Sequence, residues 1–350
     1  MSKEQLKDKL KFEPNTKTVW ICFFLCLILG AALGYGIAWK KLKAEEKRLI
    51  SQIIPVREHT NYGFINPLLS YSIPNNQEFN QFQPLENKIN AYIKNQIANG
   101  QVSQISVYFR DLNAGRWTGV NENMAYNPAS MLKVALMIAY YKQTEQIPDL
   151  LSHTISYTKD LSKEIDDVPF QTPSNLVTGK SYTVEQLIEA MIINSDNGAK
   201  NALLANIDNS SLNAVYTDLG LQAPSDNAPY TISAKNYSLF FRILYNASYL
   251  NQPLSEKALE ILNQAVYNDG LVGGVPVNTR VAHKFGEHIT TDSSGNPASV
   301  ELHDCGIIYP ASNPYILCVM TKGGTQPAAL SAAIKGISDL VYREVISGYK

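Results

Sequence analysis

The sequence predicts an α/β chain of the α+β type: an antiparallel five-stranded sheet flanked by N- and C-terminal helices, with an inserted helical subdomain, preceded by one transmembrane helix. Three observations predict this fold. Period-two alternation of apolar residues marks two strands early in the domain and three strands late. Helical periodicity fills the region between them, and a long uncharged run precedes the whole domain. Because strands come first and last, we expect the terminal helices to cover the sheet and the middle block to be an insertion.

The composition is that of an ordinary globular chain. It has 350 residues, of which 45% are hydrophobic and 17% are charged, and its formal net charge is −1. This near-neutral balance excludes a nucleic-acid-binding protein that works through global basic charge. Its 4 cysteines are too few for a disulfide scaffold.

Residues Val19–Trp39 form an uncharged run of 21 residues, which predicts a transmembrane helix. A helix of this length spans roughly 30 Å, the thickness of the hydrocarbon layer of a lipid bilayer. The alternative is a cleaved signal peptide, whose apolar stretch is usually about 7–15 residues long and ends at small residues. Here the run ends in Trp39-Lys40-Lys41, so an uncleaved anchor is favoured.

Around this helix, residues 1–18 form a basic tail, residues 40–83 a stalk or linker interrupted by prolines, and residues 84–350 the soluble domain. Lysines flank the apolar run on both sides, so the positive-inside rule does not assign its orientation. Gly30 and Gly34 form a GxxxG pattern, which is a weak signal for dimerisation of the helix.

The soluble domain opens with a helix whose apolar residues recur every three or four positions and which Asn99-Gly100 closes. Two alternating strands follow, joined by the turn residues Asn113-Ala114-Gly115. A helical block comes next, and three further strands and a helix end the chain. The predicted helices cover residues 85–97, 131–141, 184–193, 199–207, 234–245, 256–265 and 328–346. The predicted strands cover residues 104–110, 116–120, 280–285, 301–309 and 315–321.

The first group that could perform chemistry is Ser130-Met131-Leu132-Lys133, at the start of an apolar helix. Helical spacing places Lys133 one turn after Ser130 on the same face. A helix N-terminus favours developing negative charge, and a neutral amine can accept the hydroxyl proton. The plainer interpretation is a capping serine with a solvated lysine. Ser156-Tyr157-Thr158-Lys159 matches the same pattern, but it lies in a short polar stretch that offers no apolar helix to bury an amine.

The second group is Ser195-Asp196-Asn197, on a tight loop between two predicted helices, where a hydroxyl and an amide at i and i+2 can face one site. The same triplet recurs as Ser225-Asp226-Asn227 between two prolines, and we interpret that copy as an ordinary turn. The third group is Lys284-Phe285-Gly286-Glu287, on a predicted strand. A strand lysine followed by glycine can present a cation and backbone N–H groups to an anionic or carbonyl substrate. Taken alone, it is more simply an edge strand with a solvated lysine.

In this order and on these elements, the three groups resemble the S-x-x-K, S-D-N and K-T-G motifs of the penicillin-recognising serine hydrolases, most closely the class A β-lactamase-like branch. The surrounding segments NPASMLKVALMIAYY, YTVEQLIEAMIINSDNGAKNALLANI and VAHKFGE also look like that family. The resemblance covers about three-quarters of the chain. It implies a sheet with a helical insert and cleavage of an amide without a cofactor.

The resemblance also implies a role for each residue. Ser130 would attack a carbonyl and form an acyl-enzyme, Lys133 would be its base, and Ser195 would relay a proton to the leaving nitrogen. Asn197 would hold the substrate amide, and Lys284 would supply positive potential for a substrate carboxylate.

The remaining two residues of the third motif complete the expected substrate-binding set of Asn197, Lys284, Gly286 and Glu287. The backbone N–H groups of Ser130 and Glu287 would form an oxyanion hole.

Two departures from the family pattern bear on turnover and on substrate. Class A β-lactamases carry a Glu-x-x-Leu-Asn loop whose glutamate activates the water that frees the acyl-enzyme. The corresponding interval here, Leu221–Tyr230, contains no glutamate, and Asp226 is its only acid. Because general-base help is worth about 10²–10⁴-fold, we expect poor deacylation. Phe285 stands where the family has threonine or serine, which removes a donor for the substrate carboxylate.

The cysteines and histidines give weaker signals. Cys22 and Cys26 lie in the apolar run and are expected to be packing residues. Cys305 and Cys318 fall on neighbouring strands, where they can form a disulfide outside the cell or remain buried thiols, and the thiols are favoured. The 5 histidines have no metal-binding spacing, so we expect neither a metal nor another cofactor.

These observations favour a membrane-anchored serine hydrolase or acyltransferase of the β-lactamase or D,D-peptidase type. Its expected substrate is a β-lactam or a peptidoglycan stem peptide ending in D-Ala-D-Ala. That substrate implies a single-pass protein of the cell membrane with its catalytic domain outside the cytoplasm. The alternative is a catalytically inactive cell-wall-binding or scaffolding protein that retains the fold, which Phe285 and the missing loop glutamate favour.

Overall fold

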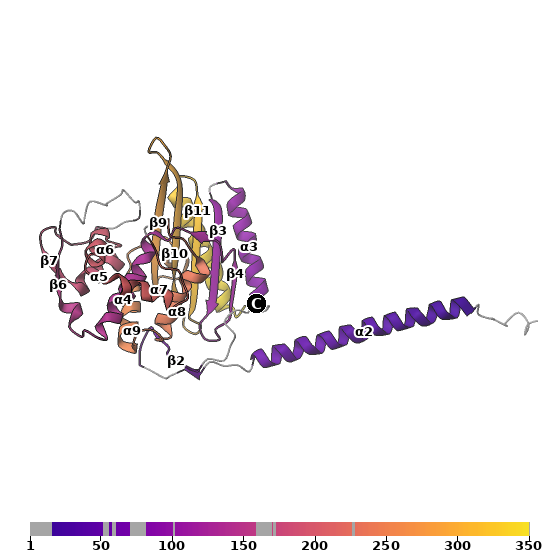
Figure 1. Ribbon diagram of the computed structural model, residues 1–350. Coiled ribbons are helices and arrows are strands. Elements are labelled where there is room, and N and C mark those ends of the chain that lie inside the picture. The colour runs from indigo at the N-terminus through magenta and orange to yellow at the C-terminus, as the bar shows by residue number, and fades with distance from the viewer. Residues whose placement is uncertain are drawn as a thin grey trace, which may run out of the picture. The chain divides into compact units, whose positions relative to one another are not determined.

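A computed structural model describes residues 16–51, 56–57, 61–70, 82–100, 102–158, 170, 173–225 and 228–349 of the chain (Figure 1). The chain divides into two compact units, with the boundary between Ile54 and Pro55. The N-terminal unit contains helix α2 (Thr16–Ser51). Within α2, residues Val19–Lys43 have a mean hydropathy of 2.3 and are long and apolar enough to cross a membrane. The apolar run identified in the sequence is therefore helical.

The second unit is built on an antiparallel five-stranded sheet, as the sequence predicts. Its spatial order is β4-β3-β11-β10-β9, so β9 lies at one edge. Every neighbouring pair of strands in it is antiparallel. The strands are β3 (Val102–Asp111), β4 (Trp117–Val120), β9 (Arg280–Thr291), β10 (Pro297–Tyr309) and β11 (Tyr315–Gly323).

The two terminal helices of the domain, α3 (Gln83–Ala98) and α10 (Pro327–Ile346), pack against one another and on one face of this sheet (Figure 1). In α3, Leu85, Ile89 and Ile93 are buried at the helical spacing that the sequence predicts. The helical block contributes α8 to the other face. The helices of that block are α4 (Lys133–Thr144), α5 (Val184–Ile193), α6 (Asn197–Leu204), α7 (Asn209–Thr217), α8 (Ala234–Tyr245) and α9 (Gln252–Leu262).

Short elements connect these parts. Three small sheets have two strands each. They pair β1 (Val56–Arg57) with β2 (Leu68–Ser70), β5 (Ala125–Tyr126) with β8 (Ile232–Ser233), and β6 (Thr154–Ser156) with β7 (Ser181–Thr183). Single 3₁₀ turns occur at η3 (Ala129–Leu132), η4 (Leu150–Ser152) and η6 (Val272–Gly274). The sequence pattern does not reveal α7 or these short elements, because each is too short to show a clear period.

The expected stalk, residues 40–83, is divided between the two compact units. Helix α2 continues to Ser51, and residues near β1 and β2 belong to the compact second unit. The side chain of Ile65 is buried, and the Glu256 carboxylate accepts hydrogen bonds from the backbone N–H groups of Gly63, Phe64 and Ile65. The compact unit therefore begins earlier than the expected boundary at residue 84.

Cys305 and Cys318 are joined by a disulfide, so the expectation of buried free thiols was wrong. The two residues are direct register partners on β10 and β11, and both are buried. Residues opposite each other on antiparallel strands have neighbouring Cβ atoms, which is the separation a disulfide requires. The choice between thiols and a disulfide depended on strand register, which the spacing of the cysteines in the sequence does not fix.

Candidate active site

Ser130 lies on the 3₁₀ turn η3, which leads directly into helix α4. Two contacts hold this turn in place. The side chain of Asn127 accepts a hydrogen bond from the backbone N–H of Ala129 at 2.9 Å, and the buried Tyr237 hydroxyl donates to the Met131 carbonyl at 2.8 Å. Ala129 has a φ of 50°, an unusual backbone conformation for a residue with a side chain. Such positions persist only where their surroundings enforce them, and they concentrate at functional sites.

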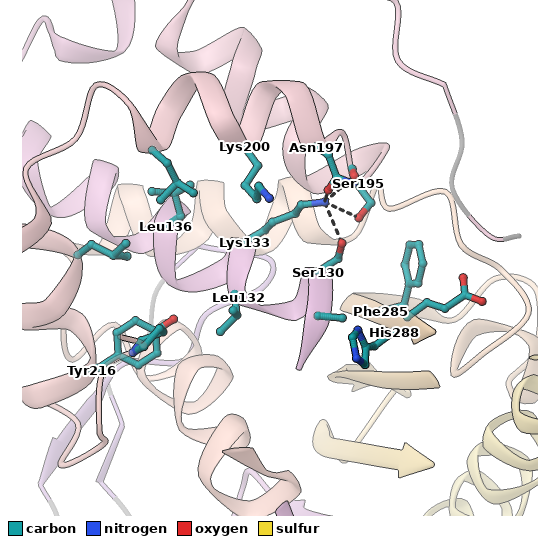
Figure 2. A pocket seen from close by; sticks show the side chains of 15 residues that line it. Ser130, Leu132, Lys133, Leu136, Ser195, Asn197, Lys200, Tyr216, Phe285 and His288 are labelled. Atoms are coloured by element: carbon teal, nitrogen blue, oxygen red, sulfur yellow. Dashed lines mark hydrogen bonds between the residues drawn. The ribbon is translucent and has the colours of Figure 1, made fainter. Parts of the chain in front are cut away.

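Lys133 is the first residue of α4, and its amine lies at the centre of the two predicted serine motifs (Figure 2). The Lys133 Nζ atom is 2.9 Å from Ser130 Oγ and 3.0 Å from Ser195 Oγ. It also donates to the Ser195 carbonyl at 2.6 Å and to Asn197 Oδ1 at 2.8 Å. The side chain is 1% exposed, so the solvated-lysine interpretation does not apply.

The surroundings of Lys133 disfavour its charged form. Burial lowers the pKa of Lys133 well below its ordinary value of 10.5, and the positive charges of Lys284 and Lys200 lower it further. The Asp196 carboxylate acts in the opposite direction but is the weakest of these influences. The amine therefore tends toward the neutral form that can accept a proton.

Ser195 lies between α5 and α6 with a φ of 59°, a second unusual backbone position beside the same amine. Asp196 is the N-cap of α6, and its side chain accepts from the backbone N–H of Ala199 at 2.7 Å. The Tyr157 hydroxyl also donates to this carboxylate, at 3.3 Å. Asp196 thus fixes the loop, which aims Ser195 and Asn197 at Lys133.

Lys284 reaches the same point from strand β9. Its Nζ atom is 2.9 Å from Ser195 Oγ and 4.3 Å from the centre of the Phe285 ring. The side chain is fully buried, and burial lowers the pKa of Lys284 to about 7, although the Asp304 carboxylate acts to raise it. Ser195 Oγ therefore lies between two lysine amines, one from α4 and one from β9.

Gly286 allows β9 to pack closely against the turn that carries Ser130. A Cβ atom at this position would lie 2.4 Å from the Pro128 carbonyl oxygen and 2.9 Å from the Met131 side chain. Real Cβ atoms do not approach a backbone carbonyl so closely, so any other residue here would push the strand away from η3. The close contact between strand β9 and the 3₁₀ turn η3, which carries Ser130, therefore explains why the third motif has a glycine at this position.

Phe285 and Glu287 lie on the face of β9 opposite to Gly286, because successive side chains on a strand alternate between its faces. Both side chains line a cavity that Ser130 also lines. The Phe285 ring packs on the Tyr267 ring, with 4.4 Å between their centres, and is 4% exposed. Glu287 is 8% exposed, and burial raises the pKa of its carboxyl to about 7. The family-based expectation used only the backbone N–H of Glu287, and it did not anticipate this buried acid.

Two further features near Lys284 and Lys133 were missed. His283 Nδ1 and Asp304 Oδ1 are 2.8 Å apart, both side chains are buried, and Asp304 also accepts from the backbone N–H of Leu271 at 2.9 Å. Asp304 comes from a different strand, so its proximity had no local signal. Lys200 did have a local signal in the sequence, because it follows Asn197 by three positions on the same helical face.

The second copies of the motifs do not assemble into a site within the described residues. Ser156 is exposed on β6, where its hydroxyl faces that of Ser181 at 3.4 Å, and Ser225 is exposed in a loop. Lys159, Asp226 and Asn227 lie outside the described residues. The interpretation of these copies as ordinary loop segments therefore stays a prediction.

A cavity of about 560 Å³ opens above the serine–lysine cluster. Its size is in the ordinary range for sites that hold a small organic molecule. Polar side chains line one part of it, and aliphatic side chains line the rest. The lining residues are Ala129, Ser130, Leu132, Lys133, Leu136, Ser195, Asn197, Lys200, Leu204, Leu212, Tyr216, Pro224, Phe285, Glu287 and His288.

Comparisons with known proteins agree with this geometry. PBP-A superposes with a TM-score of 0.64 at 20% sequence identity, over 79% of this chain and 100% of PBP-A. A beta lactamase from Xanthomonas campestris pv. campestris gives a TM-score of 0.62 at 19% identity, over 75% of this chain and 98% of its own. A class A beta-lactamase from Mycobacterium abscessus gives 0.62 at 19% identity, over 74% and 98%. No curated protein matches the chain.

At these identities the solved structures show a shared fold. The family comparison goes further, because residues 84–345 match the beta-lactamase enzyme family, and this range covers the sheet, the helical block and all three motifs. The chain belongs to the beta-lactamase enzyme family.

Proposed function

We propose that this chain is a serine acyl-transferring hydrolase that attacks an amide carbonyl through Ser130. The observation that carries the proposal is the position of Lys133 Nζ, 2.9 Å from Ser130 Oγ and 3.0 Å from Ser195 Oγ in a buried setting. A neutral amine has two N–H groups and one lone pair. The Ser195 carbonyl and Asn197 Oδ1 can accept the two N–H groups, which leaves the lone pair for the Ser130 hydroxyl proton.

The proposed acylation proceeds in three proton transfers. Ser130 Oγ attacks the carbonyl carbon while its proton passes to Lys133 Nζ, and the backbone N–H groups of Ser130 and Glu287 stabilise the resulting oxyanion. The C–N bond then breaks, and the leaving nitrogen takes a proton from the Ser195 hydroxyl. Ser195 regains its proton from the ammonium of Lys133, so the Lys133 amine and the Ser195 hydroxyl return to their starting states. Lys284, protonated, stabilises the negative charge of the substrate.

The proposed substrate is a β-lactam or a peptidoglycan stem peptide ending in D-Ala-D-Ala. A mutant of the structurally similar PBP-A has been solved as an acyl-enzyme complex with penicillin G, which supports this substrate class. We further propose that α2 anchors the chain in the cell membrane, with the catalytic domain outside the cytoplasm. Its length and hydropathy support an anchor, and a weak dimer contact through Gly30 and Gly34 is part of the same proposal.

The deciding experiment is labelling of the full chain, in detergent, with a fluorescent penicillin, followed by mass spectrometry of the labelled peptide. The proposal expects one covalent adduct on Ser130, lost in Ser130→Ala and retained in Ser156→Ala, which alters the serine of the second copy of the motif. Absence of any adduct, together with unchanged growth of cells carrying Ser130→Ala, would favour the catalytically inactive wall-binding protein instead. Phe285 in place of a hydroxyl residue is the observation that favours that second candidate.

The pH dependence of acylation provides a further prediction. The rate should rise as Lys133 loses its proton, and it should fall again as Lys284 loses its proton, because the pKa of Lys284 is lowered to about 7. Asp304 acts to raise that pKa, so Asp304→Asn should move the alkaline limb to lower pH, by on the order of one unit. The measurement is kcat/KM for acylation from pH 5 to 10, with Glu287→Gln as the control for the other group of pKa near 7. An unmoved limb in correctly folded Asp304→Asn would contradict the prediction.

A further inference from the structure

Two side chains of strand β10 hold the backbone of Asn127, which lies just before the turn η3 that carries Ser130. The Glu301 carboxylate accepts a hydrogen bond from the Asn127 backbone N–H at 2.9 Å. His303 Nε2 donates to the Asn127 carbonyl oxygen at 3.0 Å. The side chain of Asn127 in turn accepts from the backbone N–H of Ala129, the residue before Ser130, at 2.9 Å. We call Glu301, His303 and Asn127 the β10 clamp.

The hydrogen bonds of His303 fix which of its ring nitrogens carries the proton. A carbonyl oxygen can only accept, so Nε2 is the donor to Asn127. Nδ1 lies 3.2 Å from the backbone nitrogen of Thr321, whose N–H can only donate, so Nδ1 is the acceptor. The side chain is fully buried, and its ring packs edge-on against the Tyr126 ring with 5.2 Å between their centres. His303 is therefore a neutral donor with a fixed orientation toward the nucleophile turn.

The Glu301 carboxylate holds the other side of Asn127. It is almost completely buried, and its second oxygen accepts from Lys322 Nζ at 2.8 Å. Burial acts to raise the pKa of Glu301, but the neighbouring His303, Lys322 and Asn127 N–H groups together lower it to about 2. The carboxylate is thus ionised at neutral pH, and hydrogen bonds to an ionised acceptor are stronger than those between neutral groups.

The same stretch of β10 pairs with the part of β9 that lies against the nucleophile turn. His303 is the register partner of Gly286, and Leu302 is the register partner of Glu287. In the proposed mechanism, the backbone N–H groups of Glu287 and Ser130 are the two donors that stabilise the oxyanion. Strand β10 therefore holds both donors, one through antiparallel pairing with β9 and the other through Asn127.

We propose that the residues of the β10 clamp are positioning residues, which set the separation of the two oxyanion donors. The inference rests on the proposed acylation of Ser130 and adds Glu301, His303 and Asn127 to it. These three residues are not among the described residues that line the cavity, so they act through the turn. Their loss should therefore slow formation of the bond to Ser130 and leave noncovalent binding of the substrate nearly unchanged.

The test compares the full chain, in detergent, with His303→Leu and Glu301→Leu, which each remove one contact to Asn127. The probes are a cephalosporin and its analogue in which sulfur, a weak hydrogen-bond acceptor, replaces the β-lactam carbonyl oxygen. Single-turnover mass spectrometry gives the acylation rate constant and the dissociation constant of the noncovalent complex. We expect the rate constant to fall about 10²-fold with the oxygen compound and less than about three-fold with the sulfur compound, with the dissociation constant unchanged within about three-fold.

Three further variants separate positioning from stability. His303→Gln retains an N–H donor and should recover most of the lost rate. Asn127→Ala removes the acceptor for the Ala129 N–H at a half-buried turn residue, and it should show the same selective loss even where the leucine variants do not fold. Glu256→Leu is the matched control, because Glu256 is also a buried carboxylate that accepts from backbone N–H groups, and it does not line the cavity. It should lower the melting temperature and leave both rate constants unchanged.

Two kinds of result would overturn the inference while leaving acylation of Ser130 intact. One is an equal loss of rate with the oxygen and sulfur compounds, or weaker noncovalent binding in place of slower acylation. The other is an unchanged rate in Asn127→Ala together with every leucine variant that folds. Absence of an adduct between the unaltered chain and the cephalosporin would instead count against the proposed function itself.

Discussion

Replacing Lys133 with alanine should slow acylation of Ser130 by about 10²–10⁴-fold, the usual contribution of a positioned base. The expectation follows from geometry, because Lys133 Nζ is the amine that contacts both Ser130 Oγ and Ser195 Oγ, and from its lowered pKa. The measurement is the rate of adduct formation with a fluorescent penicillin under single-turnover conditions.

The matched control is Lys142→Ala, which removes a half-buried lysine from the same helix. It should acylate at the unaltered rate. Thermal unfolding separates lost chemistry from lost folding: burial of the Lys133 amine is costly, so its removal should not greatly lower the melting temperature. If Lys133→Ala acylates within a few-fold of the unaltered protein, another group must take the serine proton, and the proposed mechanism is incorrect.

The acyl-enzyme formed with a penicillin should persist, with deacylation about 10²–10⁴-fold slower than in an enzyme that positions a base for water. No glutamate lies between Leu221 and Tyr230. Of the described residues that line the cavity, Glu287 is the one acid, and it comes from strand β9 and not from the Leu221–Tyr230 interval, where the family places its glutamate. The experiment follows the mass of the labelled chain over hours after excess penicillin is removed.

Glu287→Gln is the informative variant for this second prediction. We expect it to leave the lifetime of the acyl-enzyme unchanged, because Glu287 lies on strand β9 and not in the interval where the family places the glutamate that activates water. Rapid turnover by the unaltered chain would contradict the prediction. If that turnover also disappeared in Glu287→Gln, the buried carboxyl of raised pKa would be the base that activates water.

The sequence predicted the parts of this fold whose signals are periodic. Alternation located all five strands of the sheet, and the helical period located α3 and α10 on its flank. The contact between Ser130 and Lys133 also follows from sequence, since one helical turn separates them. Lys200 was equally accessible to that reasoning, because it lies one turn from Asn197 on α6.

Other features depend on relations between distant segments, which no local pattern contains. The approach of Asp304 to His283 and Lys284 follows from the pairing of β10 with β9. The burial of Glu287 follows from the way β9 lies in the cavity wall, and the sequence alone makes an exposed glutamate on an edge strand equally reasonable. The sequence does not explain why residue 286 is a glycine. The structure does, because a Cβ atom at this position would lie 2.4 Å from the Pro128 carbonyl oxygen.

The disulfide between β10 and β11 has a practical consequence for studies of this chain. Cys305 is the register partner of Cys318 on one side and of Lys284 on the other, so the disulfide is directly adjacent to the residue to which we assign the alkaline limb of the expected pH profile. Disulfides form and persist in oxidising compartments, whereas the glutathione of the cytosol keeps thiols reduced. Recombinant material made in a reducing cytosol and material exported by the host are therefore two different chemical preparations. Their kinetic constants should be compared only after the thiol content of each has been titrated.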